Sequence, residues 1–198
     1  DREEPVGRGP SAGKFQRGIL IHKLLEILPD HSPARRPELA RQIVDQYPDF
    51  VESEREAILA EVFGVLDNPD FAAVFAEGSR AEVSLAGRVS TIRDGDVFLT
   101  AQVDRLNVTP DRVYLVDYKS NRPPPERVED VDDTYLAQMA AYRELARSVW
   151  PERAVRCGLL WTDAARMMWL HDNAMDAALR LVNAVPNSGV ATNRESPP

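Results

Sequence analysis

Two aspartates and a lysine in the middle of the sequence have the types and the spacing of a site for a divalent cation. Asp104 precedes a segment rich in turn-forming residues, 109–112, and Asp117 and Lys119 follow it. Apolar and polar residues alternate on both sides of this segment, which is typical of a β-hairpin. We therefore expect two antiparallel strands that carry all three side chains.

The apolar residues of this hairpin predict its register. A turn centred on the middle of the segment pairs Leu106 with Leu115, and it also pairs Asp104 with Asp117. Directly opposed side chains have Cβ atoms roughly 4.5–5.5 Å apart, and Lys119 shares their face because side chains alternate along a strand. Two carboxylates and an ammonium in one patch favour a hard divalent cation. The simpler alternative is a solvated polar face with a Lys–Asp pair.

The composition predicts one domain with a substantial hydrophobic core. The chain has 198 residues, of which 43% are hydrophobic, and a single cysteine, Cys157. One cysteine excludes an internal disulfide and a four-cysteine zinc or iron–sulfur site. No apolar run approaches the roughly 20 residues that a membrane helix needs, and no signal peptide is present. We therefore expect a cytoplasmic protein without membrane contact.

The charge of the chain limits how it can meet nucleic acid. A net charge of −8 argues against a free-standing module that binds nucleic acid through its overall field. It allows an enzyme whose metal ions offset acidic ligands, or one that receives its substrate from a larger partner. The sequence starts at Asp1 instead of methionine, which predicts a fragment or a processed piece.

Changes in the residue pattern divide the chain into an arm, a domain and a tail. Residues 1–13 are rich in glycine and proline and are predicted to form a linker or arm. Residues 186–198 are polar and are predicted to be a disordered tail. The domain between them, residues 14–185, is expected to have a helical part over 14–76 and a core with the sheet over 77–185.

Hydrophobic periodicity predicts helices and strands in an order that suits an α/β fold. Helices are expected over residues 15–28, 34–46, 52–66, 68–75, 134–149 and 173–185, and strands over residues 80–92, 96–108, 112–119, 155–161 and 166–170. The first three strands follow one another through short turns, so they are expected to be antiparallel neighbours. Glu82 on the first strand is a further candidate carboxylate, although an exposed strand glutamate is the commoner explanation.

Four short motifs add to this pattern. In chain order they are the Gly-x-x-x-His of Gly18 and His22, the Asp104 of QVDRL, the run Asp117-Tyr118-Lys119, and the Gln-x-x-x-Tyr of Gln138 and Tyr142. This succession resembles the PD-(D/E)XK nucleases, and within them the RecB-like branch. The segments VDYKSNRPPP and YLAQMAAYRELA resemble the C-terminal nuclease domain of AddA helicase-nuclease subunits. The chain departs from the motif at Ala101, where a glycine is expected before the Gln-x-Asp sequence.

The resemblance implies a restriction-endonuclease-like core, in which a mixed central sheet is flanked by helices, with an N-terminal helical extension. It implies that His22, Asp104 and Asp117, together with the backbone carbonyl of Tyr118, bind a metal ion. Oxygen-rich ligands suit Mg²⁺, and the imidazole makes Mn²⁺ a good substitute. Related nucleases with four cysteines hold an iron–sulfur cluster, which a chain with one cysteine cannot hold.

The resemblance also implies roles for the residues around the metal. Lys119 would orient the attacking water or stabilise the developing negative charge. We do not assign it as the base, because an ammonium between two carboxylates holds its proton. Gln138 and Tyr142 would position the strand end or the scissile phosphate. Arg105 and Arg122 are candidate contacts to the DNA backbone.

The function implied is that of a Mg²⁺-dependent deoxyribonuclease, an exonuclease within an ATP-dependent helicase-nuclease. Its substrate would be DNA, delivered as unwound single strands by the helicase part during double-strand break repair by homologous recombination, with an AddB-like partner subunit. One alternative is a catalytically silent scaffold or DNA-end-guiding domain, although such copies usually lack the lysine or an aspartate. Another is an acidic protein-interaction module, which leaves the opposed aspartates unexplained.

Overall fold

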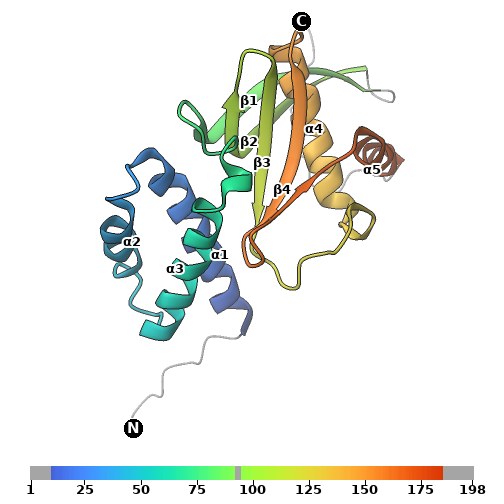
Figure 1. Cartoon of the computed structure of the whole chain (residues 1–198). Coiled ribbons are helices and arrows are strands. Elements are labelled where there is room, and N and C mark those ends of the chain that lie inside the picture. Colours follow the sequence, from blue (N-terminus) through green and yellow to red (C-terminus); the bar gives the residue numbers. More distant parts are fainter. Residues whose placement is uncertain (1–9, 92–94, 185–198) are drawn as a thin grey trace, which may run out of the picture.

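A five-stranded sheet forms the centre of the molecule and has helices on both faces (Figure 1). The structure is a computed structural model that describes residues 10–91 and 95–184. The strands lie side by side in chain order, β1 (Arg80–Thr91), β2 (Gly95–Val108), β3 (Arg112–Lys119), β4 (Ala154–Trp161) and β5 (Arg166–Trp169). Only β3 and β4 are parallel among these neighbours. The expected α/β fold with a mixed sheet is therefore confirmed.

The helices fall into two groups along the chain. The helices that precede the sheet are α1 (Pro10–Ile27), α2 (Arg36–Val44) and α3 (Glu52–Leu66). Helix α4 (Asp133–Val149) links β3 to β4, because parallel strands need a long crossover. Helix α5 (Asp172–Ala184) follows β5. None of the described helices is long and apolar enough to cross a membrane.

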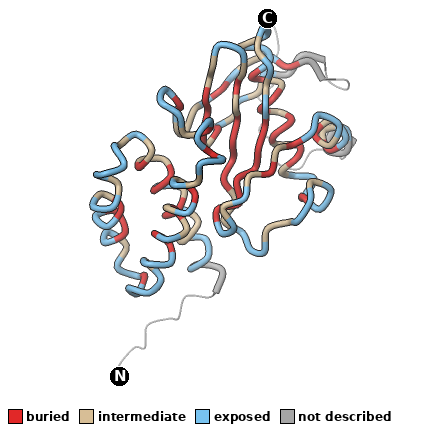
Figure 2. Tube along the Cα trace, in the orientation of Figure 1, coloured by how far each residue is buried: buried red, intermediate tan, exposed pale blue. Residues whose placement is uncertain are grey.

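Each face of the sheet is buried against one helical group, and the buried residues follow the strands in Figure 2. The first three helices pack on the face that carries Val116 and Tyr118. Helices α4 and α5 pack on the face that carries Leu115 and Leu159. This arrangement follows from the alternation of side chains along a strand, and it places Asp117 and Lys119 on the α4 side.

The register of the β2–β3 hairpin agrees with the register predicted from its apolar residues. Leu106 pairs with Leu115, and Arg105 pairs with Val116. The ladder ends at the pair of Arg105 and Val116, one position before Asp104 and Asp117.

Two parts of the helical region differ from the expected boundaries. Helix α1 begins at Pro10, so the last residues of the predicted arm are helical. Proline suits the first turn of a helix, because its missing N–H would be unpaired there. The helix expected over 68–75 is only a 3₁₀ turn, Pro69–Phe71, capped by the Asn68 side chain. Residues 1–9 and the predicted disordered tail, 186–198, lie outside the described residues.

Candidate functional site

Helix α1 brings His22 close to Asp104 on β2. The Nδ1 atom of His22 lies 3.6 Å from Oδ2 of Asp104. The helix can approach the end of β3 because residue 18 is glycine, since a Cβ atom there would lie 2.8 Å from Oγ of Ser120. His22 follows one helical turn later, on the same side of the helix. The Gly-x-x-x-His spacing therefore positions a histidine against the sheet.

The strands are irregular at the rung that contains Asp104. Val103 and Leu106 are both buried in the core beneath α4, although residues three apart on a regular strand face opposite sides. The β1–β2 ladder omits the rung of Glu82 and Asp104, and Glu82 has a positive φ of 50°. The register is the same on both sides of this rung, so neither strand contains an extra residue, but the pairing is interrupted at Asp104.

Asp104 is held by the backbone of the opposite strand. Its Oδ2 atom accepts a hydrogen bond of 2.6 Å from the N–H of Tyr118. The carbonyl of Lys119 accepts from the N–H of Thr162 after β4. Because successive carbonyls along a strand point to opposite sides, the carbonyl of Tyr118 is directed toward β2, on the side of Asp104.

Asp117 and Lys119 form a close ion pair beside Asp104. Oδ2 of Asp117 lies 2.6 Å from Nζ of Lys119, and their side chains are only 7% and 12% exposed. Burial and the charge of Asp104 raise the pKa of Asp117, against the opposing effects of Lys119 and His22. One ammonium therefore does not fully compensate the two carboxylates.

The histidine responds to the same negative charge. Burial alone would lower the pKa of His22, but the hydrogen bond and charge of Asp104 outweigh it and raise that pKa. Asp117 and Glu82 contribute in the same direction. The electrostatic field of the site therefore favours an additional positive charge.

Two residues of helix α4 contact the side chain of Lys119. Nζ of Lys119 donates to Oε1 of Gln138 at 3.4 Å, and Nε2 of Gln138 donates to the Tyr142 hydroxyl at 2.7 Å. The ring centroid of Tyr135 lies 3.8 Å from Nζ of Lys119, a cation–π contact. Burial raises the pKa of Tyr142 to about 12, so its phenol is neutral. The structure thus brings Gln138 and Tyr142 to the lysine.

The assignment of Arg105 as a DNA contact is wrong, because its side chain points into the protein. Arg105 is 1% exposed. Its guanidinium donates to the carbonyl of Leu25 and to the Ser79 hydroxyl, and it lies over the ring of Phe75. The residue therefore joins the helical group to the sheet and cannot reach a phosphate.

Arg122 has a different environment, since its side chain is 51% exposed. Its Nη2 atom lies 2.8 Å from Glu61 and 2.5 Å from Asp163. A phosphate would have to share this guanidinium with both carboxylates. A DNA contact at Arg122 therefore remains a prediction.

Two residues near the site have a conformation or a contact that the sequence did not predict. Glu82 accepts a 2.7 Å hydrogen bond from Gln102, and its positive φ could not be read from a strand-like pattern. Tyr135 belongs to the apolar stripe of α4, but its contact with Lys119 depends on the path of residues 120–132 between β3 and α4. No local sequence signal marks that path.

The oxygen and nitrogen atoms at this site suit a hard divalent cation, although the side chains do not converge on one point. In the described part of the chain, no three His, Cys, Asp or Glu side chains already converge as a metal site. Asp104 is nevertheless close enough for its charge to act on Asp117, whose pKa is raised first by burial and then by Asp104. Carboxylates and a backbone carbonyl are ligands that Mg²⁺ accepts, and imidazole also suits Mn²⁺.

Comparisons with known proteins place the whole described fold in one family. No curated protein matches the chain. Among solved structures, one entitled "Crystal structure of SSO0001" aligns over 87% of this chain and 81% of its own, with 11% identity and a TM-score of 0.35, which is too low to carry an argument. The profile of the PD-(D/E)XK nuclease superfamily matches residues 3–187. The chain therefore belongs to the PD-(D/E)XK nuclease superfamily.

Proposed function

We propose that this chain is a metal-dependent deoxyribonuclease domain that hydrolyses phosphodiester bonds. The observation that carries the proposal is the grouping of four side chains: His22 lies 3.6 Å from Asp104, Lys119 lies 2.6 Å from Asp117, and the charge of Asp104 acts on Asp117. His22, Asp104, Asp117 and the carbonyl of Tyr118 would hold Mg²⁺, or Mn²⁺ in its place. A bound metal ion lowers the pKa of water and neutralises phosphate charge.

The remaining residues act on the substrate and on the water. Lys119 is held by Asp117 and Gln138 and stabilises the negative charge that develops on the phosphate. The ring of Tyr135 contacts the same ammonium and limits its movement. Gln138 is fixed by its bond to Tyr142, and this pair positions the scissile phosphate relative to Lys119.

The order of the four motifs favours the RecB-like branch, and the segments around residues 116–125 and 135–146 favour the nuclease domain of AddA. On this proposal the domain acts as an exonuclease in the cytoplasm, on strands that an attached helicase unwinds during double-strand break repair. Its partners are DNA and an AddB-like subunit. The net charge of −8 agrees with delivery of the strand by such a partner, because a free acidic domain attracts DNA poorly.

A cleavage assay with matched aspartate variants tests this function. The purified chain with Mg²⁺ or Mn²⁺ should degrade an end-labelled single-stranded oligonucleotide, and Asp117→Asn should lower the rate by about 10²–10³-fold. Asp111→Asn is the control, because Asp111 lies in the turn of the same hairpin and its side chain is 76% exposed. Equal rates in the wild type and Asp117→Asn would refute the site. No cleavage and no metal binding by the wild type would favour a silent scaffold.

A further inference from the structure

Helix α1 exposes two large apolar side chains on the face that carries His22. Phe15 is 71% exposed and Ile19 is 46% exposed. Phe15, Ile19 and His22 occupy positions i, i+4 and i+7, which share one side of a helix. Apolar side chains grouped in solvent are typical of binding surfaces.

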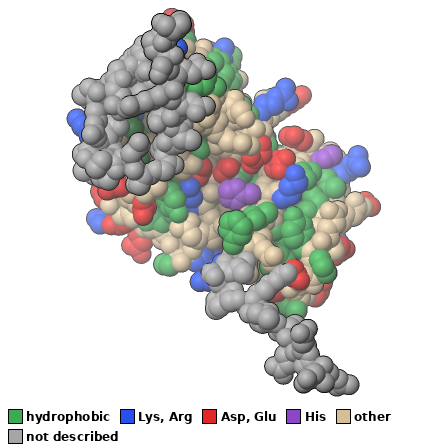
Figure 3. Space-filling view, turned by 180° about the vertical axis from the view of Figure 1, so that it is seen from behind, with side chains coloured by type: hydrophobic (Ala, Val, Ile, Leu, Met, Phe, Trp, Pro, Cys, Tyr) green, Lys and Arg blue, Asp and Glu red, His purple; other side chains and the backbone are tan. Residues whose placement is uncertain are grey.

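These side chains line an open groove that reaches His22, one of the candidate metal ligands. The groove has a volume of about 480 Å³ and is lined by Phe15 and Ile19 together with His22, Glu82 and Ser120. Phe15 lies about 10 Å from His22 along the helix axis. In the space-filling view of Figure 3, hydrophobic and acidic side chains lie around a histidine near the middle of one face of the molecule. A ligand in the groove would therefore extend to His22.

The charges along the groove distinguish the parts of such a ligand. Lys14 and Lys23 line it together with Glu26 and Glu82, and Lys23 pairs with Glu26 at 2.9 Å. Glu82 would repel a phosphate placed beside it, whereas it tolerates an uncharged ring. Lys14 adds a positive charge that can pair with a phosphate, whereas Lys23 is paired with Glu26. The charges of these four side chains sum to zero, so the apolar surface of Phe15 and Ile19 is the part of the groove that favours a flat uncharged group.

We infer that the groove holds unpaired bases of a single DNA strand, stacked on Phe15 and Ile19, as the strand enters the site at His22. The inference rests on the proposed nuclease function and names the surface that receives the single strand. Aromatic side chains stack on any base, because every base has a π-face. Bases inside a duplex are already stacked on their neighbours, so only an unpaired strand gains this contact.

The test measures binding of a fluorescent oligonucleotide to proteins that also carry Asp117→Asn, in chelator, so that no cleavage occurs. Phe15→Ala should weaken binding by about tenfold, the scale of one base stacked on an aromatic ring. Phe15→Trp should retain the affinity, because indole also stacks. Phe98→Ala is the matched control, since Phe98 is 56% exposed but lies about 20 Å along β2 from Asp104.

An oligonucleotide with an abasic tract separates stacking from a structural role of Phe15. Phe15→Ala should have less than a twofold effect on binding of this ligand, because no base is present to stack. Equal losses on both oligonucleotides, an equal loss for Phe98→Ala, or no measurable binding by any protein would overturn the inference. Cleavage by the wild type with no effect of Phe15→Ala on binding would overturn the groove alone. A Phe15 effect on binding without cleavage by the wild type would overturn the nuclease function alone.

Discussion

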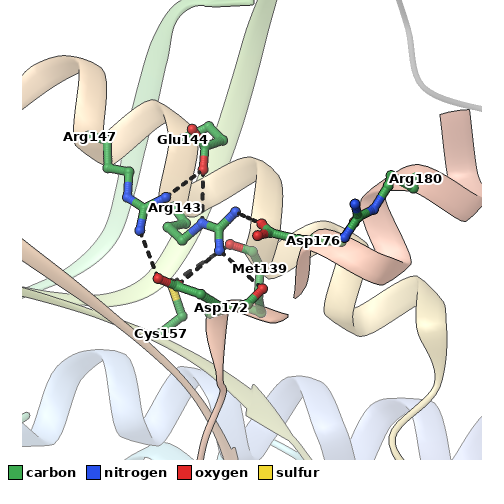
Figure 4. A network of polar contacts seen from close by, with 8 residues as sticks. All are labelled: Met139, Arg143, Glu144, Arg147, Cys157, Asp172, Asp176 and Arg180. Atoms are coloured by element: carbon green, nitrogen blue, oxygen red, sulfur yellow. Dashed lines mark hydrogen bonds and ion pairs between the residues drawn. The ribbon is translucent and has the colours of Figure 1, made fainter. Parts of the chain in front are cut away.

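Two of the clusters of charged side chains among the described residues differ in how their carboxylates are paired. The first, here called the Arg143 cluster, lies between α4 and α5 and is shown in Figure 4; it consists of Arg143, Glu144, Arg147, Asp172 and Asp176. The Arg143 side chain is 3% exposed, and each of the three carboxylates lies against a guanidinium. Burial would raise the pKa of Asp172, but hydrogen bonds from Arg143 reverse this and lower it.

The second cluster, here called the acid cluster, consists of His22, Asp104, Asp117 and Lys119. It has one ammonium and one imidazole for two carboxylates, and the pKa of Asp117 is raised there by burial and by Asp104. Each cluster has one more carboxylate than it has lysine and arginine side chains, so the number of charges does not distinguish them. The contacts do: every carboxylate of the Arg143 cluster lies against a guanidinium, whereas Lys119 lies against Asp117 and the imidazole of His22 lies near Asp104. We therefore expect the Arg143 cluster to join two helices and the acid cluster to attract a cation.

The largest expected effect comes from Lys119→Met, which should separate catalysis from metal binding. Cleavage should fall by about 10²–10³-fold, because the charge on the phosphate loses its stabilising ammonium. Binding of Mn²⁺ should remain or tighten, because Asp117 no longer has a competing partner. Single-turnover cleavage and the Mn²⁺-induced shift in melting temperature measure the two properties. Loss of metal binding in Lys119→Met would contradict the assigned roles.

For Arg143→Met we expect a loss of stability and an unchanged cleavage rate. The free energy of unfolding should fall by about 2 kcal/mol, less than for a fully buried ion pair, because the freed carboxylates are partly hydrated. Asp117→Asn without metal should keep or increase the stability, because it removes one of two repelling charges. Urea unfolding of both variants measures this difference. A loss of cleavage in folded Arg143→Met, well above twofold, would show that the two clusters do not act separately.

The two clusters should also respond to pH in opposite directions when no metal is present. The pKa of Asp172 is lowered from 3.8, so its stabilising contribution is present above that value and is lost as the pH falls through the folded-state pKa. The pKa of Asp117 is raised from 3.8, so its contribution is present below that value and is lost as the pH rises through the folded-state pKa. Urea unfolding in chelator, between about pH 3 and pH 6, measures both effects. As the pH rises, the free energy of unfolding of Asp117→Asn should increase relative to the wild type, and that of Asp172→Asn should decrease. Parallel trends for the two variants would be inconsistent with this assignment.

The smallest effect is expected from glycine substitutions that shift the histidine. In Gly18→Ala the new Cβ would lie 2.8 Å from Oγ of Ser120, which can turn aside. We expect nearly unchanged stability and a cleavage rate lower by a few fold, because α1 and His22 move slightly. Gly64→Ala is the control, since nothing lies within 4 Å of its Cβ, and it should stabilise α3 by up to about 1 kcal/mol. A cleavage loss in Gly64→Ala equal to that in Gly18→Ala would argue against a specific contact at Gly18.

The sequence predicted the hairpin and its register because short-range rules determine them. Turn-forming residues and alternating apolar residues allow one pairing that matches Leu106 with Leu115, and a shift by one residue would expose the apolar set. The same pairing brings Asp104 and Asp117 together. The presence of His22 at this rung followed only from the resemblance, because the helix periodicity does not show which strand it crosses.

The features that were missed depend on long-range packing. Arg105 is adjacent to Asp104, and nothing in its neighbourhood of the sequence shows that the helical group covers its face of the sheet. The positive φ of Glu82 lies at the interrupted rung of the β1–β2 ladder, and the contact of Tyr135 with Lys119 depends on the crossover to α4. Each requires the packed structure, which periodicity does not encode.

Calorimetric titration of Mn²⁺ into the metal-free protein tests the central claim most directly, because it requires neither DNA nor cleavage. The wild type and Asp172→Asn should bind the ion with equal affinity, and Asp104→Asn and Asp117→Asn should each lose most of the binding heat. Equal binding by all four proteins, or no binding by the wild type, would contradict the assignment of the acid cluster as the metal site.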